Sequence, residues 1–311
     1  MSKSNQLTEI HQSGKPYIIY KSRKGFNLYT NFSKKIILNK KNIKSFLTKK
    51  NKKKSKNTDL FIGFFGYELL NNLIDIKVPK QKNLNFPKGI FYKPEKKIKL
   101  SNKLNYDFEN FKSGNFKINI NRKNYTKIFN KFKKKIKCGE TYQIKICTKY
   151  KTKSKINPLD FFSRLSNTNL APEAFMIKDD NYSIISCSPE TLIIKKGSDI
   201  STKPIAGTVK KTKQLNKIKA LNYFRKNLKE TKEHNMIVDM ERNDLSRICK
   251  VGSVKIKDLK SVEEYKDLYH YVTTIKGILK NKISSFDIIK AMMPGGSVIG
   301  CPKISTLNLL N

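Results

Sequence analysis

The stretch that most constrains the fold of this chain runs from Lys229 to Ile248 and reads KETKEHNMIVDMERNDLSRI. If it forms a helix, the carboxylates of Glu230 and Glu233 lie on one face, about one turn apart. Two carboxylates in this arrangement repel each other unless a cation lies between them. Oxygen ligands of this kind suit Mg2+, which takes one or two protein carboxylates and keeps several waters. On the spacing alone, a solvated acidic pair beside Lys229 and Lys232 is the commoner alternative.

The composition is that of a folded domain and sets limits on its class. The chain has 311 residues, 38% of them hydrophobic, which suffices for one large domain or two ordinary ones. No apolar run approaches the ~18 residues of a membrane-spanning helix, and the N-terminus lacks a secretory signal. The cysteines are too scattered for a zinc site or a disulfide framework, so we expect reduced thiols, mostly in the core of a cytoplasmic protein. They are Cys138, Cys147, Cys187, Cys249 and Cys301.

The net charge of +42 points at first to a nucleic acid or an anionic membrane as partner. Only six of the 66 basic residues are Arg, however, and proteins that recognise phosphates and bases rely on Arg for bidentate contacts. Lys rises together with Asn and Ile along the chain, as an AT-rich coding bias would produce. We therefore expect no nucleic-acid or membrane partner, and a basic polyanion-binding protein is the alternative from another class.

Apolar periodicity predicts a mixture of helices and strands. Helices are expected over 125–137 (closed by Gly139), 158–166, 286–292 and the last ten residues, and strands over 17–20, 26–30, 90–92, 141–150, 175–177, 183–187, 191–194, 203–208, 252–256 and 264–278. In LFIGFFGYELL, Gly63 and Gly66 predict a buried strand that another backbone approaches closely. Glycine turns are expected at Gly207 and in PGGSVIGCPK.

Seven short motifs occur in one order along the chain: FGYEL, GETYQ, SPET, KPIAGT, KETKEHNMIVDMERNDL, YHYVTTIKG and PGGSVIGCPK. Together they resemble the chorismate-utilising enzymes, which include component I of anthranilate synthase, component I of aminodeoxychorismate synthase, and the isochorismate and salicylate synthases. The resemblance runs from about Phe61 to the end and is densest after Gly139. It implies an α+β fold in which two antiparallel β-sheets pack face to face with flanking helices. Residues 1–115 would contribute sheet edges, and residues 116–311 would form the chorismate-binding region.

The resemblance also implies roles for particular carboxylates. Glu230 and Glu233 match the family's Mg2+ ligands, with Glu233 the more direct one, and the metal would bridge them to a substrate carboxylate. Glu190 matches the general acid that protonates the departing hydroxyl of chorismate, because hydroxide is a poor leaving group. Such a role requires burial or nearby negative charge to raise the pKa of Glu190.

Further residues match the lining of the family's substrate pocket. Thr208 and His270 match catalytic positions, although a lone histidine in an aromatic strand is more often part of a core. The substrate-binding positions are matched by Gln143, Gly207, Gly296, Ser297 and Lys303. His234 is expected to be structural, and Asn243 and Asp244 are expected to close the helix end by local hydrogen bonds.

The choice among family members depends on Gln143 and Ala206. Members that add water resemble each other in carrying a lysine where this chain has Gln143, and an amide cannot act as a general base. The remaining members use ammonia from a glutamine amidotransferase subunit. Many of those that make 4-amino-4-deoxychorismate carry a nucleophilic lysine where this chain has Ala206. The residues of the other motifs favour aminodeoxychorismate synthase component I, in the folate pathway. The alternative is anthranilate synthase component I, in the tryptophan pathway.

The family pattern continues beyond Asn311, with a second pair of metal-binding glutamates and a carboxylate-binding glycine turn. The last helix is also expected to leave Ile304, Leu307 and Leu310 without a following element. We therefore expect a chain that stops inside its domain, holds half of the metal site and does not turn over chorismate by itself. A non-catalytic remnant of the family, retained for binding a partner, is a further alternative.

Overall fold

The computed structural model describes residues 3–22, 24–48, 60–69, 73, 87–104, 114–169 and 171–310. The chain divides into two compact units, each assembled from segments that are distant in sequence. The first unit comprises Met1–Phe108, Pro158–Thr191 and Asn281–Lys290, and the second comprises Glu109–Asn157, Leu192–Lys280 and Ala291–Asn311. The division of the sequence at residue 115 stays a prediction.

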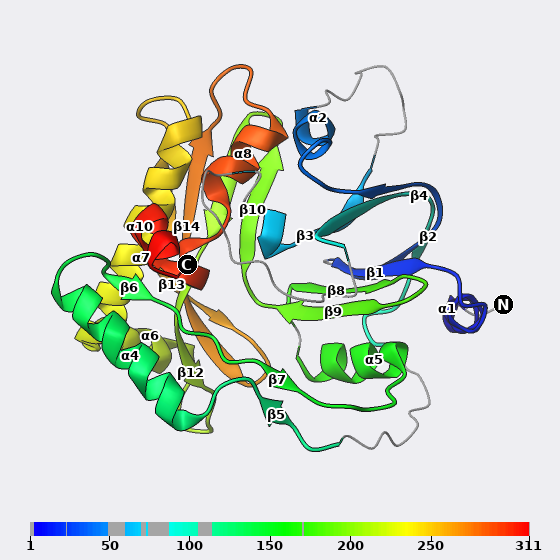
Figure 1. Cartoon of the computed structure of the whole chain (residues 1–311), viewed down its shortest axis with the longest axis horizontal. Helices are drawn as coiled ribbons and strands as arrows, with labels where there is room; N and C mark the ends of the chain where they lie inside the picture. Colours follow the sequence, from blue (N-terminus) through cyan, green and yellow to red (C-terminus); the bar gives the residue numbers. More distant parts are fainter. Residues whose placement is uncertain are drawn as a thin grey trace. The chain divides into compact units, whose positions relative to one another are not determined.

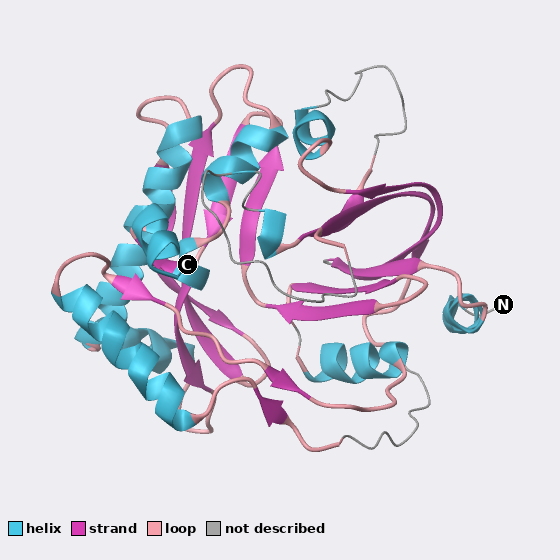
Figure 2. Cartoon of the chain, in the orientation of Figure 1, coloured by secondary structure: helices cyan, strands magenta, loops and turns pink. Residues whose placement is uncertain are grey.

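The first unit is built on a sheet whose six described strands follow the order β3-β4-β2-β1-β8-β9 (Figures 1 and 2). Its neighbouring strands run antiparallel, with Ile18 opposite both Tyr29 and Ile177. The elements are α1 (Lys3–Gln12), β1 (Tyr17–Ser22), β2 (Gly25–Ile37), α2 (Ile43–Thr48), β3 (Ile62–Phe65), η1 (Tyr67–Leu69), β4 (Gly89–Lys99), α5 (Pro158–Thr168), β8 (Glu173–Lys178) and β9 (Ser183–Ser188).

The central strand β1 is buried on both faces. Because successive side chains of a strand point to opposite faces, Ile18 and Ile19 enter two different hydrophobic clusters. Ile19 packs in the cluster that contains Phe162 of α5, while Ile18 packs in the cluster that contains Tyr92 of β4. Each fully buried side chain of this size contributes about 1.5–3 kcal/mol to folding.

The predicted close approach at Gly63 is confirmed. Gly63 in β3 lies opposite Phe91 of β4, and a Cβ atom at this position would lie 1.8 Å from the carbonyl oxygen of Ile90. Any side chain here would therefore push the two strands apart. Glycine is required by the packing of backbone on backbone.

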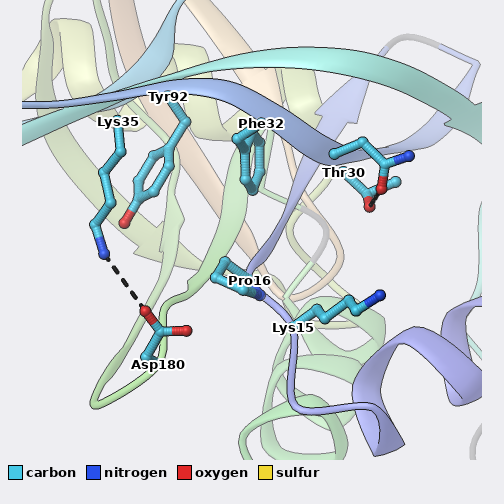
Figure 3. A pocket seen from close by; sticks show the side chains of 8 residues that line it. Lys15, Pro16, Thr30, Phe32, Lys35, Tyr92 and Asp180 are labelled. Carbon is cyan, nitrogen blue, oxygen red and sulfur yellow. Dashed lines mark hydrogen bonds and ion pairs between the residues drawn. The ribbon is translucent and has the colours of Figure 1, made fainter.

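A pocket of about 260 Å³ opens in the first unit beside the β8–β9 hairpin (Figure 3). Asp179, next to the lining residue Asp180, is 2% exposed and accepts hydrogen bonds from Lys35 Nζ at 2.7 Å and Tyr92 Oη at 2.5 Å. Lys35 also reaches Asp180 at 3.6 Å, the ion pair drawn in Figure 3. Burial opposes ionisation of Asp179, but the hydrogen bonds from Lys35 and Tyr92 outweigh it and hold the pKa well below its usual range.

The second unit is organised around β14, which has strands on both sides (Figure 1). β13 pairs along one edge of β14, whereas β11 and β12 pair with successive parts of the other edge. The elements are β5 (Lys117–Ile118), α4 (Arg122–Lys137), β6 (Gln143–Ile144), β7 (Tyr150–Lys151), β10 (Thr191–Lys196), β11 (Asp199–Lys203), β12 (Ile205–Lys210), α6 (Lys217–Lys226), α7 (Leu228–Ile248), β13 (Lys255–Glu264), β14 (Leu268–Ile278), α9 (Gly296–Ile299), β15 (Gly300–Cys301) and α10 (Lys303–Leu310). Helix α8 (Ser285–Met292) belongs to the first unit as far as Lys290, and its last two residues belong to the second.

Helices α6 and α7 pack on the sheet of the second unit. Phe224 of α6 stacks on Tyr271 of β14, with ring centroids 4.8 Å apart and planes inclined by 12°. Helix α7 begins after Asn227, whose side chain accepts hydrogen bonds from the backbone N–H groups of Lys229 and Glu230. This cap fixes where the first turn starts, and so fixes the face on which Glu230 and Glu233 project.

The predicted fold class, α+β with antiparallel sheets and helices, is confirmed, but several local predictions are wrong. Residues 141–150 do not form one strand, because their partner β15 is only two residues long and the hydrogen-bonded ladder ends with it. Gly207 lies within β12 rather than in a turn, and PGGSVIGCPK contains the short helix α9. Cys138 and Cys147 are exposed and do not fill the core. Leu307, expected to lack a partner, is 1% exposed.

No helix in the described residues has the length and apolar character needed to cross a membrane.

Candidate functional site

Glu230 and Glu233 lie in the first two turns of α7, on the face predicted from their spacing. Both side chains are half-buried. The carboxylate of Glu230 approaches the backbone of β12, since a Cβ atom built on Gly207 would lie 3.0 Å from Glu230 Oε2. Gly207 has φ +114°, a conformation that favours glycine, at a point where the pairing of β12 with β14 shifts register.

Glu233 is contacted by two side chains from the segment that begins with β6. Gln143 Nε2 donates a hydrogen bond to Glu233 Oε1 at 2.6 Å, and the ammonium of Lys145 lies 3.5 Å from the same oxygen. Pairing of β6 with β15 holds this segment in place. The other amide atom, Gln143 Oε1, is buried and has no hydrogen-bond partner. An unpaired buried acceptor is costly, so this oxygen is suited to accept a hydrogen bond from a bound molecule.

Gln143 was predicted from the sequence, whereas Lys145 was not. The signal was present in the alternation of the strand-like segment QIK, where residues two apart point to the same side. What the sequence did not show was that this side faces Glu233, which lies 90 residues from Gln143 along the chain.

Thr208 and His270 are brought together across the β12–β14 ladder. They are paired in register, and Thr208 Oγ1 lies 2.9 Å from His270 Nδ1. Burial lowers the pKa of His270, and this outweighs the raising effects of the Gly207 backbone and the charge of Glu263. His270 is therefore a neutral imidazole at neutral pH, packed edge-on against Tyr265. A neutral imidazole can either accept or donate a hydrogen bond.

His234 has the contacts of a structural residue, as predicted. It is fully buried between α7, β12 and β14, 3.1 Å from the carbonyl oxygen of Ala206 and 2.7 Å from Thr273 Oγ1. Because a carbonyl can only accept, His234 Nδ1 carries the proton and Nε2 accepts from the threonine. Burial lowers the pKa of His234, so the neutral ring fastens α7 to the sheet.

Lys303 is occupied by a buried ion pair. Its Nζ lies 2.5 Å from Asp244 Oδ2 and donates to the carbonyl oxygen of Ala291 at 3.0 Å. The expectation that Asn243 and Asp244 close the helix end is wrong, since α7 continues to Ile248 and Asp244 is paired with Lys303 of α10. These contacts use two donors of the ammonium to join α7, α8 and α10.

Gly296 and Ser297 begin the short helix α9. A Cβ atom on Gly296 would overlap the side chain of Met240, with 1.5 Å to its Cε atom. The glycine therefore lets α9 lie directly against α7. Ser297 is half-buried.

Glu190 belongs to the first unit, in the connection between β9 and β10. Its backbone N–H donates to Ser188 Oγ at 3.3 Å, and its side chain is half-buried. The second unit thus holds all the other site residues predicted from the sequence. The role of Glu190 as general acid stays a prediction.

The pair Glu230 and Glu233 fits Mg2+ in donor type and in number. Mg2+ takes one or two carboxylates and fills its remaining positions with water and substrate oxygens. Across the described ranges, no cluster of three or more His, Cys, Asp or Glu side chains could hold a metal. Zinc, which takes three or four protein ligands, does not fit this pair.

Comparison with known proteins identifies the family of this chain. Residues 103–311 match the model of the chorismate binding enzyme family. An anthranilate synthase component I-like protein of Synechocystis sp. is 31% identical over 80% of this chain and 57% of its own length. Aminodeoxychorismate synthase component 1 of Bacillus subtilis is 32% identical over 64% of this chain and 42% of its own length. The chain thus spans about half the length of these relatives.

Solved structures show the same fold. The crystal structure of anthranilate synthase component I from Streptococcus pneumoniae superposes with a TM-score of 0.73 and 24% identity, covering 94% of this chain and 73% of that one. MenF, the menaquinone-specific isochorismate synthase of Escherichia coli, superposes with a TM-score of 0.71 and 14% identity, covering 94% and 71%. Since the match of the family model extends over residues 103–311 and the fold agrees, the chain belongs to the chorismate binding enzyme family.

Proposed function

We propose that this chain is component I of an ammonia-dependent synthase that converts chorismate to 4-amino-4-deoxychorismate, with ammonia from a glutamine amidotransferase subunit. The observation that carries the proposal is the amide of Gln143 on Glu233, the candidate metal ligand. Gln143 occupies the position where water-adding members of the family carry a lysine. An amide has no basic lone pair with which to deprotonate water, so a nucleophile that is already neutral and basic fits better.

In this proposal, different side chains of the second unit bind Mg2+, ammonia and the substrate. Glu230 and Glu233 would hold Mg2+, which when bound supplies positive charge to offset a carboxylate of the substrate. Gln143 Oε1, buried and unpaired, would accept an N–H of ammonia and fix its position beside the ring. Neutral His270, oriented by Thr208, would hydrogen-bond the substrate without adding charge.

Two further groups complete the proposal. Glu190 would donate the proton that lets the hydroxyl of chorismate leave as water. Ala206 is 5% exposed, and its carbonyl oxygen accepts a hydrogen bond from His234 Nδ1. The methyl side chain of Ala206 provides no nucleophile. In this proposal ammonia therefore attacks the ring directly, without a covalent enzyme intermediate.

Anthranilate synthase component I is the second candidate, because Ala206 stands where that enzyme also lacks the lysine. The two products differ in the ring position of the new nitrogen. Anthranilate forms with loss of pyruvate and is fluorescent by itself. The 4-amino-4-deoxychorismate product needs a separate lyase to become fluorescent 4-aminobenzoate.

The test combines chorismate binding with product analysis. Calorimetry should show chorismate binding that requires Mg2+ and is lost in Glu233→Gln. Incubation with chorismate, Mg2+ and ammonium chloride, followed by mass spectrometry, identifies any product that forms. 4-Amino-4-deoxychorismate would support the proposal and would contradict the expectation that the chain by itself does not turn over chorismate. Fluorescence would then rise only after the lyase is added. Anthranilate would establish the second candidate, isochorismate would overturn the argument from Gln143, and absence of Mg2+-dependent chorismate binding would overturn the proposal.

A further inference from the structure

Lys145 is a cation already present at the candidate metal site. Its ammonium lies 3.5 Å from Glu233 Oε1, the oxygen that also accepts from Gln143. The backbone N–H of Lys145 donates to the carbonyl oxygen of Ile299 at 3.0 Å, so its main chain is fixed. The side chain, in contrast, is 39% exposed, so water can solvate its ammonium group if the contact with Glu233 is broken.

The ion pair between Lys145 and Glu233 resembles the contact that a divalent cation would make. Mg2+ bound to the Glu233 carboxylate would carry two positive charges, and these would repel the Lys145 ammonium a few ångströms away. Mg2+ must therefore either displace the ammonium group from Glu233 or bind with lower affinity because of the repulsion between the two cations. Because both side chains are partly exposed, at 39% and 29%, solvent reduces this repulsion without abolishing it.

We propose that Lys145 competes with the divalent cation for Glu233 and thereby keeps the metal affinity of the substrate-free chain low. The inference rests on the proposed function, since it takes Glu233 as a Mg2+ ligand. A dianionic substrate such as chorismate favours Mg2+ binding at Glu233, because its carboxylates offset the positive charges of both the metal and Lys145. Mg2+ and substrate then bind with positive coupling, and each raises the affinity for the other by the same factor.

The experiment is a titration of the purified chain with Mg2+ alone, at low ionic strength, by calorimetry. Four variants are compared with wild type: Lys145→Met, Lys145→Arg, Lys232→Met and Glu233→Gln. Lys232 is an exposed lysine on α7, so Lys232→Met removes the same charge one residue from Glu233 without removing the contact. Lys145→Met should lower the Kd for Mg2+ by about five- to tenfold. Lys145→Arg, which keeps the charge, should stay within about twofold of wild type.

A second titration with chorismate present tests the coupling. The factor by which chorismate tightens Mg2+ binding should be smaller in Lys145→Met than in wild type and unchanged in Lys232→Met. Circular dichroism verifies that each variant is folded, and Lys145→Gln replaces Lys145→Met if the methionine variant is not.

The outcomes separate this inference from the proposed function. If wild type binds Mg2+, Glu233→Gln does not, and Lys145→Met resembles Lys232→Met, then the competition is refuted while the metal site stands. If Glu233→Gln binds Mg2+ as well as wild type, the metal assignment fails, and the role of Lys145 fails with it. If neither wild type nor Lys145→Met binds Mg2+, both ideas are overturned.

Discussion

The two halves of helix α7 carry carboxylates in opposite situations. In the N-terminal half, Glu233 is 29% exposed and is held by a neutral amide and a partly exposed ammonium. In the C-terminal half, Asp244 is 1% exposed and is paired with Lys303, which is also buried. A buried pair cannot exchange its partner, because either charge left alone in the interior is strongly destabilising. A half-exposed ion pair separates at a small cost in free energy, because water solvates the two separated charges.

This difference assigns separate tasks to the two halves. The C-terminal half anchors α7, through Asp244 to Lys303 and through Glu241, whose Oε2 accepts from Thr202 Oγ1 at 3.2 Å. The N-terminal half keeps Glu230 and Glu233 half-buried, as the proposed metal site requires. The predictions below test this contrast through the free energy of unfolding, from the largest expected change to the smallest.

Lys303→Met should destabilise the chain most, by about 3–5 kcal/mol, because it leaves the Asp244 carboxylate buried without its cation. Urea unfolding followed by circular dichroism measures the change. The double variant Lys303→Met with Asp244→Leu should recover most of the loss, because no charge remains to be buried. A loss below about 1 kcal/mol in the single variant would show that this half of α7 is no more anchored than the other.

Asp179→Asn extends the comparison to a buried carboxylate of the first unit. Hydrogen bonds from Lys35 and Tyr92 hold the pKa of Asp179 below its unfolded value near 3.9, so its ionised form stabilises the fold. That contribution is complete above the unfolded pKa and disappears as the pH falls through the folded pKa. The variant should be about 2–3 kcal/mol less stable than wild type at pH ~7.

The difference between wild type and Asp179→Asn should shrink as the pH is lowered below about 4. Urea unfolding at a series of pH values measures it. A difference that stayed constant with pH would mean that the side-chain shape at residue 179, and not its charge, supports the β8–β9 hairpin.

Gly207→Ala tests the contact between β12 and the N-terminal half of α7. The added methyl group would meet Glu230 Oε2 at 3.0 Å and adopt φ +114°, which L-residues avoid. We expect a loss of about 1–2 kcal/mol and a weaker Mg2+ affinity, because the Glu230 carboxylate has to move. Gly252→Ala serves as a matched control, since its φ is also positive while no atom lies within 4 Å of the added Cβ. Equal Mg2+ affinities in the two variants would contradict the proposed involvement of Glu230.

Glu233→Gln should change the stability least, by under about 1 kcal/mol, because the half-exposed amide still accepts a hydrogen bond from Gln143. Its Mg2+ binding should nevertheless be lost. A large loss of stability in this variant would place Glu233 with Asp244 among the anchoring residues and would remove the contrast between the two halves.

The amino-acid sequence determined the features that depend on local periodicity. The spacing of Glu230 and Glu233 predicted the helical face that carries both carboxylates. Glycine among the aromatic residues of 60–70 indicated a close approach of two backbones, and the strands predicted over 175–177 and 183–187 correspond to β8 and β9. Helix capping and strand alternation act between residues only a few positions apart, so the sequence displays them directly.

Only the tertiary structure decided which distant side chains share a carboxylate. Gln143 and Lys145 reach Glu233 because β6 pairs with β15, and a two-residue ladder leaves no periodic pattern in the sequence. Lys303 is one of many lysines, and its burial against Asp244 follows from the docking of α10 on α7. The same residue types therefore form an anchoring pair at one end of α7 and an exchangeable one at the other. Burial makes that difference, and it is a property of the packed molecule.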